Sequence, residues 1–322
     1  MINNKNNSEI PIFFSIDDGY APYLAVALNS AIKNSSADRC YRAIVLHNGL
    51  SWENQERIAQ LEAPNFSIEF YQMEKGLEAI TDRRSNYLRC DYFTLTIYFR
   101  LFIPAMFPEL DKGIYIDSDV VVLGDLAELF DIDLGDNYIG ACNDKSVVDV
   151  PPLARYMEEY IGVKKEEYIN SGVLLMNLKL LREKGFDEHF LTLLNRYHFD
   201  SIAPDQDYIN AICNGRIKYL GEEWDAMPND NAPELEGARL IHYNLFSKPW
   251  CYDGIQYGEY FWKYALDSGY LEEIEEFKAN YDDQKKKSDS DCLDLLIQNG
   301  AKFCENEISF KKEHEKGEKI RL

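Results

Sequence analysis

Two aspartates, Asp117 and Asp119, lie between two apolar, β-type runs at residues 114–116 and 120–123. In an extended backbone, side chains two positions apart project to the same side of the chain. The two carboxylates therefore converge and repel each other, and burial increases this repulsion unless a cation or protons compensate. A hard divalent cation with oxygen ligands is the natural partner of such a pair. The flanking apolar residues place the pair at a buried sheet edge, which favours a metal site over two solvated turn aspartates.

The segments that precede this pair predict an α/β architecture. Strands are expected at 10–16, 42–47 and 66–71, with helices at 24–33 and 52–61 between them. This order is typical of a mainly parallel sheet with crossover helices, in which ligands bind outside the carboxyl ends of the strands. Asp17 follows the first strand as Asp117 follows a later one, so both are expected at the same edge.

The rest of the chain predicts more helices and strands around this sheet. Further helices are expected at 92–107, 151–161, 178–197 with a break at Gly185, 203–212, 257–266 and 271–281, and strands at 138–142, 168–178, 216–220 and 238–242. We divide the chain into a catalytic domain, residues 1–270, and a polar, helical C-terminal extension, residues 271–322. The extension is expected to contain a small helix at 293–297 and to be partly mobile because it is so polar.

The composition excludes several classes of protein. A net charge of −22 repels the phosphates of nucleic acids, so any bound nucleotide is expected to be small and held through a metal. The seven scattered cysteines include no Cys-X-X-Cys pair, which indicates reduced, mostly buried thiols of a cytoplasmic protein. Residues 1–7 are polar and do not form a secretory signal, and no apolar run reaches membrane-spanning length.

Two further features have more than one interpretation. Arg100 is the one charge in the apolar segment 92–107, and it either reaches the surface or points back at a carboxylate or phosphate. Asp205 and Asp207 follow Pro204 at a helix start, where acidic residues favour the positive end of the helix dipole. Taken alone, the two aspartates indicate helix stabilisation only.

Six short motifs, in their order along the chain, resemble those of the family 8 glycosyltransferases. These motifs are Phe14-Ser15-Ile16-Asp17-Asp18-Gly19-Tyr20, Arg100, Tyr115-Ile116-Asp117-Ser118-Asp119, Asn170-Ser171-Gly172-Val173, Asp205-Gln206-Asp207 and His242-Tyr243 followed by Lys248-Pro249-Trp250. The family contains retaining, metal-dependent enzymes of the GT-A fold, such as bacterial lipopolysaccharide galactosyl- and glucosyltransferases and glycogenin. The resemblance covers about residues 10–265 and implies this fold for most of the chain.

The resemblance implies a metal held by Asp117, Asp119 and His242. Two carboxylates and one imidazole suit Mn²⁺, and Mg²⁺ with less preference. Diphosphate oxygens of a UDP-sugar would fill the remaining coordination positions, and the metal would act as a Lewis acid on the leaving diphosphate. Lys248 would add a second positive charge, the loss of which typically costs ~2.7–4 kcal/mol of barrier. Its alternative interpretation is a solvated loop lysine.

The same resemblance implies roles around the donor sugar nucleotide. Asp17 would read the uracil edge, Tyr20 would stack on the uracil ring, and Asp117 would also accept from ribose. Four residues would line the transferred hexose: Arg100, Asn170, Asp205 and Gln206. Ser15, Ser118 and Ser171 belong to the same motifs and are assigned to the donor pocket.

The catalytic roles are implied for Gln206, Asp205 and Lys248. Gln206 would lie beneath the anomeric carbon, but a neutral amide is a poor nucleophile, so Asp205 is the alternative nucleophile. The expected route is a front-side displacement in which the leaving phosphate oxygen deprotonates the acceptor.

Several positions depart from the prototype galactosyltransferase or remain open. Gly19 stands in place of an asparagine that contacts the nucleotide, and Leu245-Phe246 replace smaller residues near the diphosphate. Trp224 and Trp250 either stack on an acceptor sugar or close the core.

The sequence therefore predicts a Mn²⁺-dependent, retaining glycosyltransferase that moves a hexose from a UDP-sugar to a glycan, glycolipid or glycoprotein acceptor. It is expected in the cytoplasm, where Lys285–Lys287 could add ~1 kcal/mol per residue of attraction to the inner membrane face, although neighbouring acids favour a solvated tail. One alternative is a non-catalytic nucleotide-sugar-binding protein. Another is a nucleotidylyltransferase, which the acidic turn Asp17-Asp18-Gly19 disfavours. Galactose or glucose as donor, the acceptor and the oligomeric state stay open.

Overall fold

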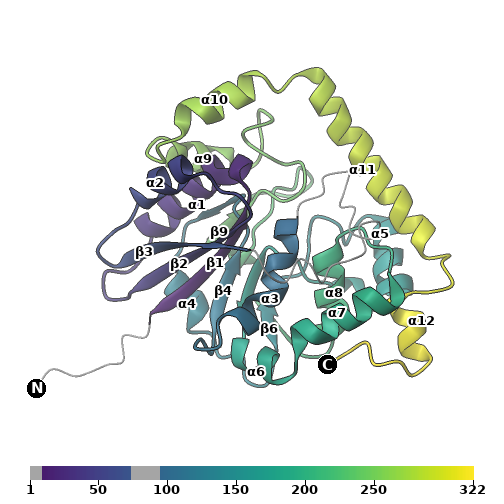
Figure 1. Ribbon diagram of the computed structural model, residues 1–322. Coiled ribbons are helices and arrows are strands. Elements are labelled where there is room, and N and C mark those ends of the chain that lie inside the picture. Colours follow the sequence, from purple (N-terminus) through teal and green to yellow (C-terminus); the bar gives the residue numbers. More distant parts are fainter. Residues whose placement is uncertain (1–8, 74–94) are drawn as a thin grey trace, which may run out of the picture.

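The computed structural model describes residues 9–73 and 95–322. In this part of the chain, a seven-stranded sheet has the order β3-β2-β1-β4-β7-β6-β8, and a short second sheet pairs β5 with β9. Strands β1 to β4 run parallel, β7 is antiparallel to both β4 and β6, and β8 is parallel to β6. Helices pack on both faces (Figure 1). The predicted α/β fold with a mainly parallel sheet is confirmed.

The elements have the following bounds. The strands are β1 Ile10–Ile16, β2 Tyr41–His47, β3 Phe66–Gln72, β4 Gly113–Ile116, β5 Val120–Val122, β6 Ile139–Ala141, β7 Val173–Met176, β8 Ile217–Tyr219 and β9 Leu240–His242. The helices are α1 Ala21–Lys33, α2 Trp52–Ala59, α3 Phe99–Met106, α4 Leu126–Phe130, α5 Pro151–Tyr156, α6 Leu178–Glu183, α7 Phe186–Tyr197, α8 Pro204–Cys213, α9 Gly258–Ala265, α10 Leu271–Ala279, α11 Asp283–Phe303 and α12 Phe310–Glu315.

The sheet separates two hydrophobic cores, because alternate side chains of a strand point to opposite faces. Ile12 and Phe14 of β1 belong to the core shared with α1, α9 and α10, whereas Phe13 between them belongs to the other core. Both faces of β1 are therefore buried, as its continuous apolar sequence predicts. This burial fixes the carboxyl end of the strand, where Asp17 follows.

Local signals in the sequence set several helix ends. Ser51 caps α2, with its Oγ accepting from the amide of Asn54 at 3.3 Å. The predicted break at Gly185 separates α6 from α7 and has a left-handed φ of 64°, which glycine adopts without strain. The predicted helix at 92–107 is a 3-10 turn, Leu95–Tyr98, followed by α3; residues 92–94 lie outside the described residues.

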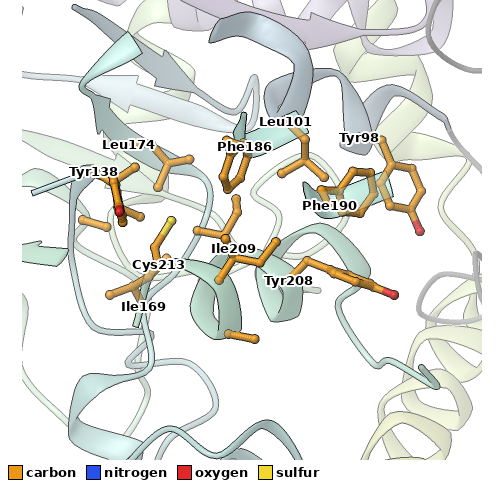
Figure 2. Packing of buried hydrophobic residues seen from close by; sticks show 14 of the residues in the cluster. Tyr98, Leu101, Tyr138, Ile169, Leu174, Phe186, Phe190, Tyr208, Ile209 and Cys213 are labelled. Atoms are coloured by element: carbon orange, nitrogen blue, oxygen red, sulfur yellow. The ribbon is translucent and has the colours of Figure 1, made fainter. Parts of the chain in front are cut away.

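Helix α8 is buried along its whole length. Figure 2 shows Tyr208, Ile209 and Cys213 of this helix among side chains of the second core, which include Phe186 and Phe190 of α7. The ring of Tyr208 packs edge-on against Phe190, with the centroids 5.0 Å apart. This packing fixes the first turn of α8, which carries Asp205 and Gln206.

The C-terminal extension differs from its prediction of a small helix in a partly mobile tail. Helix α11 has 21 residues and leads from α10 across to α5 and α12 (Figure 1). Leu296 is buried, and Gly300 lies so close to α5 that a Cβ would come 2.8 Å from Cδ2 of Leu153. Leu296 and Ile297 supply apolar contacts with the core, despite the polar composition of the helix.

Two predictions from the composition concern the cysteines and membranes. Cysteines 142, 213, 251 and 304 are buried free thiols and Cys40 and Cys292 are partly exposed ones, while Cys90 lies outside the described residues. Among residues 9–73 and 95–322, none of the helices has both the length and the apolar character that a bilayer crossing demands.

Candidate active site

Three side chains that could hold a metal converge where the chain leaves the main sheet. Asp117 directly follows β4 and Asp119 directly precedes β5, so the pair lies in the bend between the two sheets. Strand β9 pairs with β5 and places His242 opposite Val120. One ligand atom each of Asp117, Asp119 and His242 lies within 4.8 Å of the others. The backbone is bent, where an extended one was expected, yet the carboxylates converge as predicted.

The imidazole of His242 lies between two carboxylates. Its Nδ1 is 2.9 Å from Oδ1 of Asp225, and its Nε2 is 3.3 Å from Oδ1 of Asp119. Burial lowers the pKa of His242, but the two carboxylates outweigh burial and raise this pKa to about 10. Lys248 also contacts Asp119 through Nζ. Although burial acts to raise the pKa of Asp119, Lys248 and His242 hold it well below its usual range.

Gly172 keeps the space between these ligands open. A Cβ at this position would lie 2.3 Å from Cε1 of His242 and 2.8 Å from Oδ2 of Asp117. Only glycine fits here without displacing both ligands. Two carboxylates and an imidazole nitrogen around this space match the donor set that Mn²⁺ or Mg²⁺ takes, so the residues fit such an ion.

Arg100 connects helix α8 to the corner formed by Asp117, Asp119 and His242, which we call the metal corner. Its Nη2 is 2.7 Å from Oδ1 of Asp117, and its Nε is 3.2 Å from Oδ2 of Asp205. Its Nη1 donates to the carbonyl oxygen of Ser171 at 2.6 Å, and its guanidinium lies over the ring of Tyr115 at 4.3 Å. Arg100 is buried, so the first of its two interpretations, a surface arginine, is wrong.

The side-chain amide of Gln206 is held at both ends. Its Oε1 accepts from the amide of Ser171 at 3.0 Å, and its Nε2 donates to Oδ2 of Asp144 at 2.8 Å. The same Asp144 oxygen accepts from Nδ2 of Asn170 at 3.1 Å. Asp205 accepts from Oγ of Ser171 at 3.0 Å, so it is bound to both this hydroxyl and a guanidinium. The carboxyl terminus of β6 and the first turn of α8 are thus linked beside the pocket.

Aromatic side chains lie beside Asp17 in the same site. Asp17 accepts from the amide of Tyr20 at 3.2 Å, and Tyr20, which is 40% exposed, lines the larger cavity. Tyr20 packs edge-on against Tyr23, which stacks on Trp250 with the ring centroids 4.1 Å apart. Trp224 and Trp250 are both buried, which agrees with their interpretation as core residues; Trp224 lines neither cavity, whereas Trp250 also lines the larger one.

All the predicted site residues line one of two adjoining cavities. The larger, of about 600 Å³, is lined by Asp17, Tyr20, Arg100, Asp117, Asp119, Asn170, Ser171, Asp205, Gln206, His242 and Lys248. The smaller, of about 170 Å³, adds Ser15 and Ser118. The structure therefore brings the predicted residues together, and their individual roles stay predictions.

The larger cavity also has a wall that the sequence did not indicate. Ser288, Asp289 and Cys292 of α11 line it. Oδ2 of Asp289 accepts from the hydroxyls of Tyr252 and Tyr281, both at 2.6 Å, which holds the helix against the catalytic part. The predicted C-terminal extension therefore contributes to the same pocket as the predicted catalytic domain.

Two buried carboxylates beside the site were also missed in the sequence. Asp144 holds Gln206, and Asp225 holds His242. Asp144 stands before Lys145 and resembles any surface-loop acid in the sequence. Asp225 does carry a signal, because it is a charge inside an otherwise apolar loop from Trp224 to Pro228.

Comparisons with known proteins agree with this geometry. The model described as Glycosyl transferase family 8 matches residues 11–254. A Haemophilus influenzae protein described as a glycosyltransferase is 31% identical over 220 residues, 68% of this chain and 64% of that protein, so the chain spans less than two thirds of its length. The lipopolysaccharide 1,2-glucosyltransferase of Escherichia coli K12 is 26% identical over 288 residues, 82% of this chain and 80% of that enzyme.

Solved structures show the same fold. The galactosyltransferase LgtC, crystallised with donor and acceptor sugar analogues, is similar with a TM-score of 0.69 and 28% identity, covering 80% of this chain and 95% of that one. This similarity confirms the GT-A-type fold expected from the motifs.

Proposed function

Because the chain belongs to glycosyl transferase family 8, we propose that it is a retaining, Mn²⁺-dependent hexosyltransferase that takes galactose or glucose from a UDP-sugar. The observation that carries the proposal is that Asp117, Asp119 and His242 converge and line one pocket. The same pocket is lined by Asp17 and Tyr20 and by Arg100, Asp205 and Gln206. Together these side chains offer groups suited to the base, the diphosphate and the hexose of a UDP-sugar.

The nucleotide end binds by hydrogen bonding and stacking. Asp17 already accepts one backbone hydrogen bond, and its remaining oxygen lone pairs can accept from the N–H of uracil. The exposed face of Tyr20 offers a stacking surface that contributes ~1–3 kcal/mol for bases bound to proteins. Both groups would orient the base without acting on the reacting bonds.

The centre of the pocket would hold the diphosphate. Asp117, Asp119 and Nε2 of His242 would hold Mn²⁺, which supplies Lewis-acid stabilisation of the leaving diphosphate when bound. Lys248 lies at this corner, where its ammonium contacts Asp119, and a small rotation of its flexible side chain would bring the charge to a phosphate oxygen. Preorganised charge of this kind acts where negative charge develops in the transition state.

The hexose end favours displacement without a covalent enzyme intermediate. Asp205 is bound to Arg100 and to Oγ of Ser171, and both interactions weaken it as a nucleophile. Gln206 is fixed by Asp144 and the Ser171 amide, and with a donor bound its amide would lie beside the anomeric carbon. We propose that the acceptor hydroxyl attacks from the face that the diphosphate leaves, and that a phosphate oxygen takes its proton.

The acceptor belongs to the proposal as well. The similarity to a lipopolysaccharide glucosyltransferase supports a bacterial surface glycan or glycolipid precursor, which the enzyme would reach from the cytoplasm at the inner membrane face. A glycoprotein precursor is the other carbohydrate-bearing acceptor compatible with the pocket.

The test is UDP release from a panel of UDP-glucose, UDP-galactose, UDP-N-acetylglucosamine and UDP-galacturonate, with Mn²⁺ and water as acceptor. We expect turnover of UDP-glucose or UDP-galactose, loss of this turnover with EDTA, and none with GDP-glucose. Binding of the UDP-sugars without any turnover would instead identify a non-catalytic binding protein. Formation of UDP-glucose from UTP and glucose 1-phosphate would identify a nucleotidylyltransferase.

A further inference from the structure

We propose that Asp225 is a positioning residue that fixes the ring orientation and the proton of His242, so that Nε2 is the nitrogen presented to the metal. This inference rests on the metal site of the proposed function and adds a residue to it. Asp225 does not line either cavity of the site, so it acts only through the histidine.

The contact between the two side chains is short and buried. Oδ1 of Asp225 is 2.9 Å from Nδ1 of His242, and the exposed fractions of the two side chains are 0% and 2%. A neutral imidazole carries its proton on one nitrogen only, and the hydrogen bond at one nitrogen determines which. With the proton on Nδ1 and donated to Asp225, the lone pair remains on Nε2, the nitrogen that faces Asp119. A carboxylate in this position also raises the basicity of a metal-binding histidine.

Backbone pairing holds the aspartate in this place. The amide of Ala226 donates to the carbonyl of Leu240 at 2.9 Å, and the amide of His242 donates to the carbonyl of Ala226 at 2.8 Å. Ala226, the residue after Asp225, is thus hydrogen-bonded to Leu240 and His242, the two residues that flank Ile241 in β9. The distance between Asp225 and His242 is therefore set by the fold and not by two independently mobile side chains.

The second carboxylate oxygen of Asp225 argues for a role in positioning His242 and against a role in stabilising the fold. Oδ2 is buried and has no hydrogen-bond partner among the described residues. A buried carboxylate oxygen without a donor lowers stability, and stabilising carboxylates normally satisfy both oxygens. Asp225 has one good hydrogen-bond partner, the imidazole of His242. We therefore infer that this aspartate serves to orient the ring.

The experiment measures Mn²⁺ binding without turnover, by electron paramagnetic resonance titration of free Mn²⁺ on the full chain without UDP-sugar. Asp225→Asn retains an acceptor but loses the charge, so we expect about 10-fold weaker binding, and Asp225→Ala about 100-fold. Pulsed measurements on bound Mn²⁺ should show nitrogen coupling from His242 in the wild type, and this coupling should be lost in Asp225→Ala. The matched control is Asp207→Asn, a buried carboxylate that lines neither cavity and, among the described residues, is bound only by hydroxyls and one backbone amide, whose Mn²⁺ affinity should stay within twofold.

The outcomes distinguish the inference from the proposed function. Wild-type protein that does not bind Mn²⁺ overturns the metal site and the role of Asp225 with it. Wild-type binding with unchanged affinity and nitrogen coupling in both Asp225 variants overturns the role of Asp225 alone. If Asp225→Ala fails to fold in circular dichroism, the isosteric Asp225→Asn decides, and an affinity within twofold of the wild type contradicts the inference.

Discussion

Aspartates in the interior and at the pocket are stabilised in two different ways in this molecule, and the first is at the fully buried Asp207 in helix α8. Its carboxylate accepts from the hydroxyls of Tyr156 at 2.8 Å and Tyr168 at 2.6 Å, from Ser201, and from the amide of Ala203 at 3.2 Å. No cation pairs with it in residues 9–73 and 95–322. Burial raises its pKa, and these donors oppose that shift.

The second way is at the metal corner, where Asp117 and Asp119 are neutralised by cations. Arg100 pairs with the first, and Lys248 and His242 with the second. These carboxylates face the pocket, with 26% and 14% of their side chains exposed. Hydroxyl and amide donors satisfy the carboxylate of Asp207 inside the protein. At the partly exposed carboxylates of Asp117 and Asp119, by contrast, a bound metal ion can take the place of a side-chain cation. The comparison predicts that Asp207 serves stability and that the corner serves binding and chemistry.

The largest expected effect is that of Asp119→Asn. The change removes one proposed metal ligand and its charge, so we expect Mn²⁺-dependent UDP release to fall about 10³-fold, roughly 4 kcal/mol of barrier. Circular dichroism should show a retained fold, because Lys248 can turn into the pocket. Turnover within tenfold of the wild type would contradict the metal assignment.

The next effect concerns the cation that contacts Asp119. Lys248→Met should lower kcat by about 10²–10³, about 2.7–4 kcal/mol, because a charge aimed at the leaving diphosphate is lost. Affinity for Mn²⁺ should be equal or tighter, since the ammonium no longer competes for Asp119. Equal losses in kcat and in Mn²⁺ affinity would show that Lys248 supports the metal and not the leaving group.

The third prediction concerns Asp207, the aspartate that is bound by hydroxyls and not by cations. Asp207→Asn replaces an acceptor of four hydrogen bonds by an amide, so buried donors lose their partner, at about 1–3 kcal/mol. Urea unfolding should show this loss of stability, while UDP release per folded molecule should stay near the wild-type value. A large loss of activity with unchanged stability would remove the distinction between the two kinds of aspartate.

Much of this organisation is predictable from sequence because it is local. The apolar run of β1, the cap at Ser51 and the break at Gly185 each depend on residues within one or two turns of chain. Asp17 and Asp117 were predictable at one sheet edge, because each follows a strand of the parallel part and parallel strands bring their carboxyl ends together. The other site residues were implied by the resemblance of their motifs to the family.

What was not predictable depends on pairings between distant segments. Nothing local in the sequence shows that the loop at Asp225 lies against β9, or that Asp144 contacts the first turn of α8. The same holds for α11, whose polar composition hid the apolar face that packs on α5. The local sequence does not separate Asp205 from Asp207, because both fit a helix N-terminus; the family resemblance assigned Asp205 to the site, and of the two only Asp205 lines the cavity.

The smallest expected effect is a pH dependence of the metal-free protein, which follows from the cationic character of the corner. Burial lowers the pKa of His242, but the flanking carboxylates outweigh this effect and raise the pKa from its ordinary value of 6.5 to about 10. A group with a raised pKa contributes stability that is complete below pH 6.5 and is lost as the pH rises toward 10. With EDTA, the advantage in Tm of the wild type over His242→Gln should therefore shrink between pH 6.5 and 9.5. The effect is modest because Lys248 still neutralises Asp119. An advantage that stays constant over this range would mean that His242 is uncharged without metal, and that Lys248 alone balances Asp119.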